Sequence, residues 1–343
     1  LDDAGVGKKS ESIFPKLFRL RGVTPQKAFQ RYYYNLWKMF RAGFSCCLRN
    51  RIKVILANSW TLPGITAFLL HKVFGIPYMI FAHGLELHNP QKSKRVAWLM
   101  SRVLGDASRV IAISSYTCQR VQEYVPAACV RIIPPFIDTK RFAAEKIVPD
   151  KRLSNKRVLL TVGRLVAHKG QDIVIKALSR IRAQCPDIVY CIVGSGPYEE
   201  ALRQAAVFHG VADSAVFAGE VPDNELAAYY ASCEVFLGVS RYIEKTGEVE
   251  GFGIVFLEAA ACSKPAIAGR SGGIADAVVD GETGLLVDPE SSEEVAAAVI
   301  RLCNDKEFAR RLGQQGKKRV EEEFSLDSFT RKFTEVMHEA GIE

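Results

Sequence analysis

The fold assignment of this chain centres on nine residues, Glu250–Glu258, with the sequence EGFGIVFLE. Gly251–Gly253 predicts a loop, because glycine tolerates positive φ and lets a ligand approach the backbone. From Ile254 through Cys262 the residues are apolar or alanine apart from one acid, and leucine and alanine are strong helix formers. We therefore predict a glycine loop that opens a buried helix.

Such a helix start can bind an anion. Its first N–H groups have no intrahelical partner and the helix dipole places partial positive charge there, so a phosphate is favoured. Glu250 would stand before the helix and Glu258 about one turn inside it, where the two carboxylates could hold sugar hydroxyls. The glycine pattern alone fits a sheet-packing helix after a turn equally well. The paired acids favour the binding site, because buried glutamate is rare without a partner.

Strands and helices alternate on both sides of this stretch, which predicts parallel sheets covered by helices. In residues 151–324 the predicted strands are Val158–Val162, Ile188–Val193, Val216–Ala218, Val235–Leu237, Ala266–Ala268 and Leu285–Val287. In residues 1–150 they are Val54–Ala57, Tyr78–Ala82, Val110–Ile113 and Val130–Ile133. The pattern predicts two Rossmann-like domains, whose ligands gather beyond the carboxyl ends of the strands.

Three local signals concern turns and helix starts in the second half. The loop Gly194–Pro197 lacks a full G-x-G-x-x-G pattern and an acid about 20 residues further on, so we predict a tight turn and no NAD site. Asp223 predicts a helix N-cap. Ser291 with Glu294 predicts the capping box of a further helix.

The charge of the chain is unevenly distributed. The 343 residues fit two domains of about 150 residues and carry a net charge of +8. The first 150 residues contain 23 Lys and Arg against 9 Asp and Glu. An anionic membrane surface, an anionic substrate or a nucleic acid would each suit such a basic half. No RNA- or DNA-binding motif accompanies the charge, so we expect no nucleic-acid partner.

The basic excess includes a predicted amphipathic helix, Pro25–Leu48. Apolar residues recur there at steps of three and four, with basic residues between them. These apolar residues are Phe29, Tyr33, Leu36, Phe40 and Phe44. Two interpretations remain open. The helix could face the core with its lysines in solvent, or it could dock on anionic lipid headgroups, which Trp37 supports.

Two further observations bear on location. No apolar run approaches the 18 or so residues of a membrane-spanning helix, and no signal peptide is found. The nine cysteines, an odd number without C-x-x-C spacing, predict reduced thiols. We expect a cytoplasmic protein that could lie peripherally on the inner face of the plasma membrane.

Cations and a histidine follow the predicted strands. Arg164 and Lys169 come after Val158–Val162, and a planar guanidinium fork, a mobile ammonium and a helix start together suit a diphosphate. His83 follows Tyr78–Ala82 and should look into the crevice, although a structural role fits equally well. No carboxylate cluster has metal-ligand spacing, so we expect cations to supply the charge that Mg²⁺ supplies elsewhere.

Four segments of the second half form a specific combination: GRLVAHKG at 163–170, E-x7-E at 250–258, SGG at 271–273 and DGETG at 280–284. They resemble glycosyltransferase family 4, whose members are retaining, nucleotide-sugar-dependent enzymes of the GT-B fold, with two Rossmann-like domains facing a cleft. Residues 249–255, VEGFGIV, are most similar to bacterial mannosyltransferases acting on phosphatidylinositol mannosides. The first half matches more loosely, at residues 83–84, 114–117 and 138–142.

The resemblance implies a role for each motif residue. Arg164 and Lys169 would hold the donor diphosphate and neutralise the leaving group. Glu258 would bind ribose hydroxyls, and Glu250 hydroxyls of the transferred sugar. The other contacts would come from the backbone of Phe252, Gly253 and Ile254 near sugar and phosphate, the backbone around Glu220 and Val221 near the base, and His83 on the reacting face.

The resemblance also implies a domain organisation. Residues 1–150 would form the acceptor-side domain, 151–324 the nucleotide-sugar domain, and 325–343 a helix that crosses back to the first domain. Relatives begin with a strand and a Gly-Gly loop that close over the donor phosphates. We find neither, so we expect the first strand to be missing. Phe136 stands where relatives often have glycine and would reshape the hinge side of the cleft.

The expected function is retaining transfer of a hexose, with mannose favoured, from a GDP- or UDP-sugar to a lipid-linked or saccharide acceptor, without a metal or other cofactor. Two alternatives remain. A GT-B-like nucleotide-sugar epimerase shares the fold and donor site but uses no acceptor. A non-catalytic sugar-nucleotide-binding protein is compatible with the missing first strand.

Overall fold

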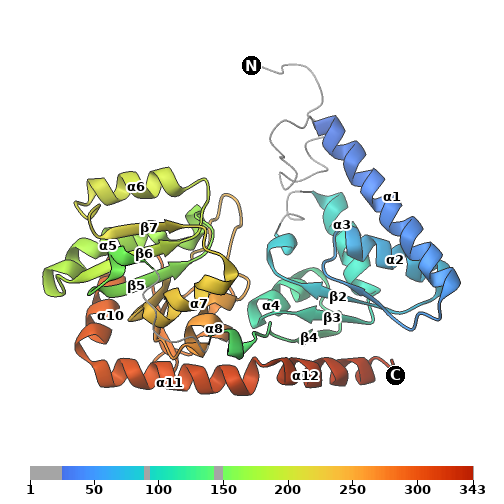
Figure 1. Ribbon diagram of the computed structural model, residues 1–343. Coiled ribbons are helices and arrows are strands. Elements are labelled where there is room, and N and C mark those ends of the chain that lie inside the picture. Colours follow the sequence, from blue (N-terminus) through green and yellow to red (C-terminus); the bar gives the residue numbers. More distant parts are fainter. Residues whose placement is uncertain (1–24, 89–92, 143–149, 343) are drawn as a thin grey trace. The chain divides into compact units, whose positions relative to one another are not determined.

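A computed structural model describes residues 25–88, 93–142 and 150–342, without the side chains of residues 25–29 (Figure 1). By their contacts the residues divide into two compact units. The first comprises the chain up to Ile133 and again from Phe333, and the second is Pro134–Lys332. Each unit is built on a parallel sheet with helices between its strands, so the predicted α/β class is confirmed.

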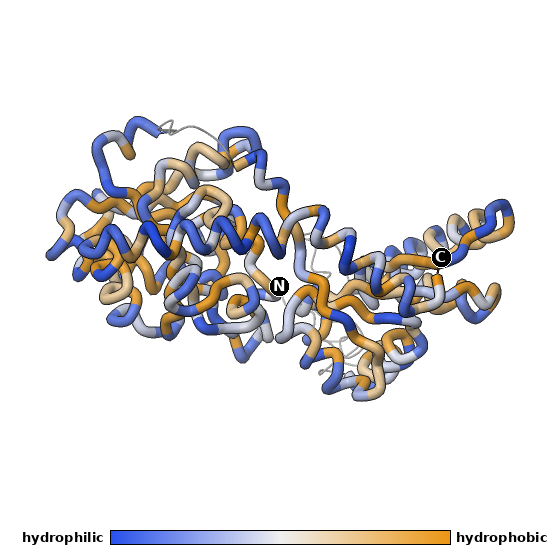
Figure 2. Tube along the Cα trace, turned by 90° about the horizontal axis from the view of Figure 1, so that it is seen from below, coloured by the Kyte–Doolittle hydropathy of each residue, from blue (hydrophilic) through white to orange (hydrophobic). Residues whose placement is uncertain are grey.

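The described part of the first unit contains a four-stranded parallel sheet in the order β1-β2-β3-β4. Its strands are β1 (Ile55–Ala57), β2 (Tyr78–Ala82), β3 (Arg109–Ala112) and β4 (Val130–Ile132), each within one residue of its predicted bounds. The helices between them are α2 (Leu62–Phe74), α3 (Lys94–Gly105) and α4 (Ser115–Tyr124), with a short 3₁₀ turn, η2 (Leu85–Leu87), after β2. Figure 2 shows hydrophobic segments gathered inside each unit.

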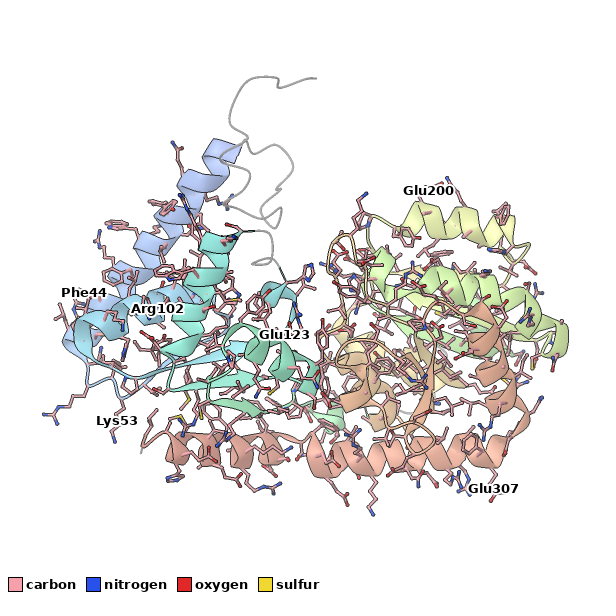
Figure 3. The ribbon with its side chains drawn as sticks, turned by 180° about the vertical axis from the view of Figure 1, so that it is seen from behind. Phe44, Lys53, Arg102, Glu123, Glu200 and Glu307 are labelled. Carbon is pink, nitrogen blue, oxygen red and sulfur yellow. The ribbon has the colours of Figure 1, made fainter. Side chains whose placement is uncertain are left out.

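Helix α1 (Pro25–Arg49) packs one face on this unit. Phe44, labelled in Figure 3, lies 5.9 Å from Phe40 and 5.0 Å from Phe74 of α2, measured between ring centroids. Leu36 packs against the core of the unit. Leu36, Phe40 and Phe44 therefore lie on the face that packs on the unit, as in the core-facing interpretation of this helix. Phe29 lies outside the described side chains.

The other face of α1 is exposed. Tyr33, although it shares the three- and four-residue spacing of the apolar positions, is 48% exposed: the inward face continues at the half-buried Tyr32, four residues before Leu36 rather than three. We define the basic aromatic face as Tyr33, Tyr34, Trp37, Lys38 and Arg41. Lys38 lies 4.8 Å from the ring centroid of Tyr34, and the guanidinium of Arg41 lies 5.3 Å from that of Trp37.

The second unit contains a six-stranded parallel sheet in the order β10-β9-β8-β5-β6-β7. Its strands are β5 (Arg157–Val162), β6 (Ile188–Val193), β7 (Ala215–Gly219), β8 (Val235–Gly238), β9 (Ala266–Gly269) and β10 (Gly284–Val287), again within one residue of the predicted bounds. Starting from β5, the chain builds one side of the sheet and then returns to build the other. The junction of β5 and β8 is therefore a topological switch point, where such sheets bind ligands.

Helices cover both faces of this sheet. They are α5 (Gln171–Gln184), α6 (Glu199–Phe208), α7 (Asp223–Ser232), α8 (Ile254–Ala261), α9 (Ile274–Ala277), α10 (Ser292–Asn304) and α11 (Lys306–Glu323). In β8, Val235 and Leu237 join the core beneath α5 and α10, whereas Phe236 lies 5.6 Å from the Tyr230 ring of α7 and 5.5 Å from the Phe256 ring of α8. The alternation places consecutive residues in two cores, which is why the whole strand is apolar.

The chain crosses between the units in two segments. After Pro134, the backbone N–H of Ile137 donates to the Phe324 carbonyl at 3.0 Å, and Phe142 of η4 (Thr139–Phe142) lies 5.8 Å from the Tyr230 ring. These contacts assign residues from Pro134 onward to the second unit, whereas the sequence analysis placed its start at residue 151. Helix α12 (Leu326–Glu339) begins in the second unit and ends in the first.

Of the two predicted helix caps, the one at Ser291 is confirmed in part and the one at Asp223 is wrong. The Ser291 hydroxyl accepts a hydrogen bond from the Glu294 N–H at 3.1 Å, as predicted, but the Glu294 carboxylate accepts from the Asp288 N–H rather than from Ser291. The Asp223 prediction is wrong, because Pro222 occupies the N-cap position and Asp223 is the first helical residue. Its carboxylate instead lies 3.3 Å from the Arg141 guanidinium.

Two chain-wide observations complete the fold. Among the described residues, none of the helices combines the length and apolarity needed to cross a bilayer. All nine cysteines lie in the described ranges and are free thiols.

Candidate active site at the switch point of the second sheet

The switch point is flanked by the loops that follow β5 and β8. The first contains Arg164 and a 3₁₀ turn, η6 (Ala167–Lys169), and the second ends in Glu250 and the glycine loop before α8. Although 81 positions apart in the sequence, Lys169 and Glu250 form an ion pair between Nζ and Oε2. Their side chains are 21% and 17% exposed. The structure therefore brings together two residues that the sequence analysis assigned to one site.

Arg164 lies at the same edge with its side chain exposed. Within the described residues its guanidinium forms no hydrogen bond or ion pair, while its backbone carbonyl accepts from Gln171 Nε2 at 3.2 Å. The loop is thus held through its backbone, which leaves the guanidinium of Arg164 available to an anion.

A half-buried ion pair supports the loop that carries Lys169. The guanidinium of Arg241 lies 2.9 Å from the Asp172 carboxylate in the first turn of α5, and the Arg241 N–H donates to the His168 carbonyl at 2.8 Å. His168 is 6% exposed, and burial followed by the charge of Lys169 lowers its pKa. A neutral His168 adds no repulsion to the neighbouring ammonium. The sequence analysis did not identify Asp172 or Arg241, because their pairing spans 69 positions.

Helix α8 begins as predicted. Gly253 is its N-cap residue, with a φ of 90° in the left-handed region. The Phe256 N–H bonds back to the Gly253 carbonyl at 3.0 Å, which leaves the amides of Ile254 and Val255 without an intrahelical partner. Ile254 is 41% exposed, so this end of the helix is accessible. An anion placed here would meet free amides and the positive end of the helix dipole.

The backbone of Glu250 is held by the SGG segment. The Gly273 N–H donates to the Glu250 carbonyl at 2.9 Å. Gly272 has a φ of +57°, and a Cβ on it would lie 2.2 Å from the Glu250 carbonyl oxygen. Glycine is therefore required at residue 272 for the two segments to approach. The predicted motif residues 271–273 act on Glu250 through its backbone.

Glu258 lies within α8 on a different set of contacts. Its Oε2 accepts a hydrogen bond from the Tyr230 hydroxyl of α7 at 2.6 Å. Burial raises the pKa of the Glu258 carboxyl, while the Tyr230 hydrogen bond and the nearby Arg141 charge oppose that shift. The two predicted acids therefore have different environments, with an ammonium at Glu250 and a phenol at Glu258. No sequence pattern marks Tyr230 as a site residue, because it lies among the apolar residues of a helix.

The loop after β7 holds the residues predicted near a base. Glu220 is exposed and accepts a hydrogen bond from the Ser195 hydroxyl, and Val221 follows it, half buried. Ser195 belongs to the predicted tight turn: the Leu165 N–H donates to the Ser195 carbonyl at 2.8 Å, and the Gly194 N–H to the Gly219 carbonyl at 2.7 Å. This turn therefore links the loops after β5, β6 and β7.

His83 lies in the first unit, directly after β2. Its Nε2 lies 2.9 Å from the backbone carbonyl oxygen of Asn58. A carbonyl can only accept, so Nε2 carries the proton and the neutral ring has an acceptor at Nδ1. The His83 N–H donates to a Glu86 carboxylate oxygen at 2.6 Å. The exposed ring is therefore oriented, with Nδ1 left to interact with a ligand hydroxyl.

Among residues 25–88, 93–142 and 150–342, no group of three or more His, Cys, Asp or Glu side chains is arranged to hold a metal ion.

Two family descriptions together match most of the chain. Residues 144–319 match the family described as Glycosyl transferases group 1, and residues 7–141 match Glycosyltransferase Family 4. The first match alone covers about half of the chain and includes every site residue described above for the second unit.

Two relatives in the comparison are mannosyltransferases of the same name. The GDP-mannose-dependent alpha-(1-6)-phosphatidylinositol monomannoside mannosyltransferase of Mycolicibacterium smegmatis is 39% identical over 227 residues, which cover 64% of this chain and 59% of the relative. The protein of the same name from Mycobacterium tuberculosis is 38% identical over 249 residues, which cover 71% and 65%. The match thus spans less than two thirds of either relative.

Solved structures are similar in fold. HepE from Anabaena, in complex with UDP, has a TM-score of 0.77 at 20% identity, covering 89% of this chain and 82% of that one. Sucrose-phosphate synthase from Thermosynechococcus elongatus has a TM-score of 0.76 at 26% identity, covering 90% and 79%. These likenesses, with two parallel sheets in the described residues, confirm the predicted GT-B fold class. The chain belongs to the family Glycosyl transferases group 1.

Proposed function

We propose that this protein transfers a hexose, with mannose favoured, from a nucleoside diphosphate sugar to a lipid-linked or saccharide acceptor, with retention of anomeric configuration. The observation that carries the proposal is the Lys169–Glu250 ion pair beside the exposed Arg164 at the switch point of the second sheet. GDP is the favoured nucleotide, because two relatives are GDP-mannose-dependent enzymes.

The donor diphosphate would lie between the cations and the start of α8. Arg164 presents a planar fork and Lys169 a point charge, so the two can bind different phosphates. The free amides of Ile254 and Val255 would add donors on the other side. The ion pair with Glu250 keeps the Lys169 ammonium in place. Such preorganised charge stabilises a leaving diphosphate without reorganisation at the moment of reaction.

Glu250 and Glu258 would bind different parts of the rest of the donor. Glu250, beside Lys169, would accept bonds from hydroxyls of the transferred sugar, and the Phe252–Ile254 backbone would border the sugar and phosphate. Glu258 has one oxygen on Tyr230, and we assign its remaining acceptor capacity to the ribose hydroxyls. The backbone at Val221 would border the base.

The chemistry exchanges one bond at the anomeric carbon. The bond from that carbon to the diphosphate oxygen breaks, and the bond to the acceptor oxygen forms on the same face. The acceptor hydroxyl then lies beside the departing phosphate oxygen, which can take its proton. Arg164 and Lys169 would stabilise the charge that develops on that phosphate, so we propose that no metal ion is needed. His83 would accept a bond from a sugar hydroxyl through Nδ1.

The first domain would bind the acceptor, and the second the donor, with the end of the chain forming the crossover helix. We further propose that the basic aromatic face of α1 rests on an anionic lipid surface on the cytoplasmic side. Helix α1 contains no Asp or Glu, and Tyr34 and Trp37 are each 54% exposed. Aromatic rings at headgroup depth beside cations are typical of interfacial helices. The product would then be a glycolipid or membrane-linked polysaccharide.

A donor screen tests the proposed function. GDP- and UDP-sugars are ranked by thermal shift, and the best donor is incubated with phosphatidylinositol mannoside or oligomannoside acceptors after removal of divalent metal by chelation. We expect an acceptor-dependent mannosylated product with the anomeric configuration of the donor by NMR. Interconversion of the donor sugar without acceptor would instead establish an epimerase. Binding without transfer or hydrolysis would establish a sugar-nucleotide-binding protein.

A further inference from the structure

Arg319, near the end of α11, contacts the short helix α9, which holds the backbone of Glu250. Its Nη2 donates to the Asp276 carbonyl at 2.8 Å and its Nη1 to the Ala277 carbonyl at 3.2 Å, at the end of α9. The N-cap of that four-residue helix is Gly273, whose N–H holds the Glu250 carbonyl. Arg319 therefore secures one end of a short helix whose other end secures Glu250.

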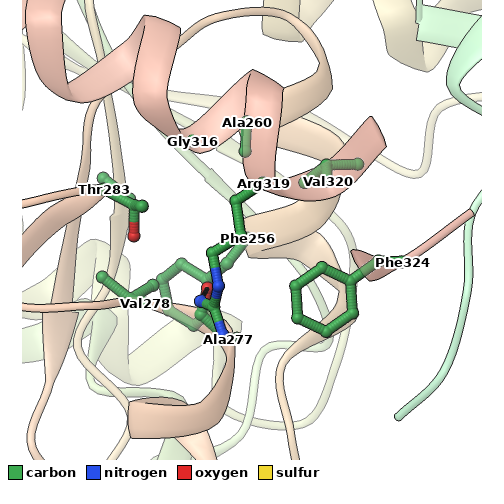
Figure 4. Close-up of a pocket in the computed structure, with 10 residues that line it drawn as sticks. Phe256, Ala260, Ala277, Val278, Thr283, Gly316, Arg319, Val320 and Phe324 are labelled. Carbon is green, nitrogen blue, oxygen red and sulfur yellow. Dashed lines mark hydrogen bonds between the residues drawn. The ribbon is translucent and has the colours of Figure 1, made fainter. Parts of the chain in front are cut away.

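Phe324, which follows α11, reaches a second support. Its ring centroid lies 5.0 Å from the guanidinium of Arg319 and 5.7 Å from the ring centroid of Phe252. Phe252 and Phe324 are each 2% exposed. Figure 4 shows Arg319 and Phe324 among the residues that line a narrow cavity beside α8. Because Phe252 stands two residues after Glu250, this edge-to-face contact constrains the same loop.

Both supports connect Glu250 with Arg319. In the first, the Gly273 N–H bonds to the Glu250 carbonyl, and the helix α9 that follows Gly273 ends on the Arg319 guanidinium. In the second, the Arg319 guanidinium lies over the Phe324 ring, which contacts the Phe252 ring of the Glu250 loop. The Arg319 side chain is only 19% exposed, and its Nε also lies 3.1 Å from the Glu323 carboxylate. A planar guanidinium can serve two carbonyls, a carboxylate and a ring face together, whereas an ammonium cannot.

We propose that Arg319 and Phe324 are positioning residues that hold Glu250 and the Phe252 loop where the transferred sugar binds. The inference rests on the proposed function and extends it to residues outside the donor contacts. Both residues act on the sugar end of the site. The nucleotide end, at Glu258 and Val221, has its own contacts and should be little affected.

The main variant is Arg319→Lys, which keeps the charge and removes the fork. Arg310→Lys is the matched control, because Arg310 is exposed on the same helix and its guanidinium donates a hydrogen bond to the Gln314 side chain at 3.5 Å, away from α9. In Arg319→Lys we expect GDP affinity within about twofold of wild type by calorimetry. GDP-mannose affinity and kcat should each fall about tenfold, because even a small displacement of groups that orient the substrate lowers the rate. Arg310→Lys should change neither.

A second pair of variants tests the aromatic support. Phe324→Leu should also lower GDP-mannose affinity and kcat more than GDP affinity. Phe308→Leu is the control, because Phe308 is a partly buried ring on α11 that packs against the core beneath α5 and α10.

Amide exchange gives a readout that needs no substrate. In the ligand-free protein, Arg319→Lys should speed hydrogen exchange at the Gly273 N–H, and Arg310→Lys should not. Unchanged exchange at Gly273, or equal losses of GDP and GDP-mannose affinity, would overturn the inference. A wild-type protein that transfers no sugar would overturn the proposed function instead, and the exchange measurement would still decide whether Arg319 holds this loop.

Discussion

The hydroxyl of Tyr230 on α7 donates a 2.6 Å hydrogen bond to Oε2 of Glu258 on α8. Burial raises the pKa of the Glu258 carboxyl, and the bond from Tyr230 opposes that rise. The state of this carboxylate therefore depends on a residue that lies outside the E-x7-E motif.

Replacing Tyr230 by Phe should raise the pKa of Glu258 further, because the ionised form loses a donor while staying buried. The pH below which nucleotide binding weakens should then move upward. Calorimetric titrations with GDP across a pH series measure this. Tyr229→Phe is the control, since Tyr229 is a neighbouring buried tyrosine without a hydrogen bond to Glu258. Identical pH profiles for wild type and Tyr230→Phe would contradict the assignment of Glu258 to the nucleotide.

The same carboxyl should make stability depend on pH. Its folded pKa lies above the unfolded value, so its contribution to stability is full below the unfolded pKa of about 4.3 and is lost as pH rises through the folded pKa. Glu258→Gln cannot ionise. Its melting temperature relative to that of wild type should therefore rise as the pH is raised from about 4 towards neutrality, the range over which the wild-type carboxyl ionises. Melting curves of Glu225→Gln, at an exposed site on α7, should show no such relative gain.

Removing either cation of the proposed diphosphate site should cost the transfer reaction at least about a hundredfold in kcat, the scale of a lost oxyanion-type donor. Lys169→Ala and Arg164→Ala are compared with Lys176→Ala, an exposed lysine on α5. Initial rates of mannosyl transfer at saturating donor measure the effect. Unchanged turnover in both site variants would remove the assigned roles.

A methyl group at residue 272 should displace Glu250. Gly272→Ala strains a positive φ and places a Cβ 2.2 Å from the Glu250 carbonyl oxygen. Gly281→Ala strains a similar φ of +73° but meets nothing within 4 Å. We expect both variants to lose about 1 kcal/mol of stability to backbone strain, and only Gly272→Ala to lose transfer activity about tenfold or more. Equal activities in the two variants would show that Glu250 does not depend on this contact.

The basic aromatic face of α1 should bind anionic vesicles. Sedimentation with vesicles containing phosphatidylinositol at low ionic strength should pellet the protein, and salt should release it, because screening weakens attraction between exposed charges. Trp37→Ala should lower the bound fraction severalfold, whereas Phe208→Ala, at an 85% exposed ring in the second unit, should not. A protein that stays in the supernatant under these conditions would exclude the proposed lipid contact.

Local sequence patterns predicted the strands and most helices well. Every described strand falls within one residue of its prediction, because each strand is a short apolar run bounded by glycine, proline or polar residues. In α1 the apolar spacing permits steps of three or four residues, so it did not distinguish Tyr33, which is 48% exposed, from Tyr32, which is half buried.

The partners of the predicted site residues were less accessible from the sequence. The resemblance placed Glu258 and Lys169 at one site, yet Tyr230 and the Arg241–Asp172 pair lie in segments without any motif. Such contacts depend on how α5, α7 and the loop after β8 pack on the sheet, and a single sequence does not encode that packing as a local pattern. Asp223 shows the reverse case, in which a good capping residue was displaced by Pro222.

The Lys169–Glu250 pair also bears on turnover. In the proposed donor complex, Glu250 would be engaged by sugar hydroxyls and Lys169 by phosphate. After transfer of the sugar to the acceptor, the Glu250 carboxylate would be free to pair again with the Lys169 ammonium, as it does in this structure, and so compete with the spent nucleoside diphosphate. The acid that recognises the sugar would thereby help to expel the by-product and limit product inhibition.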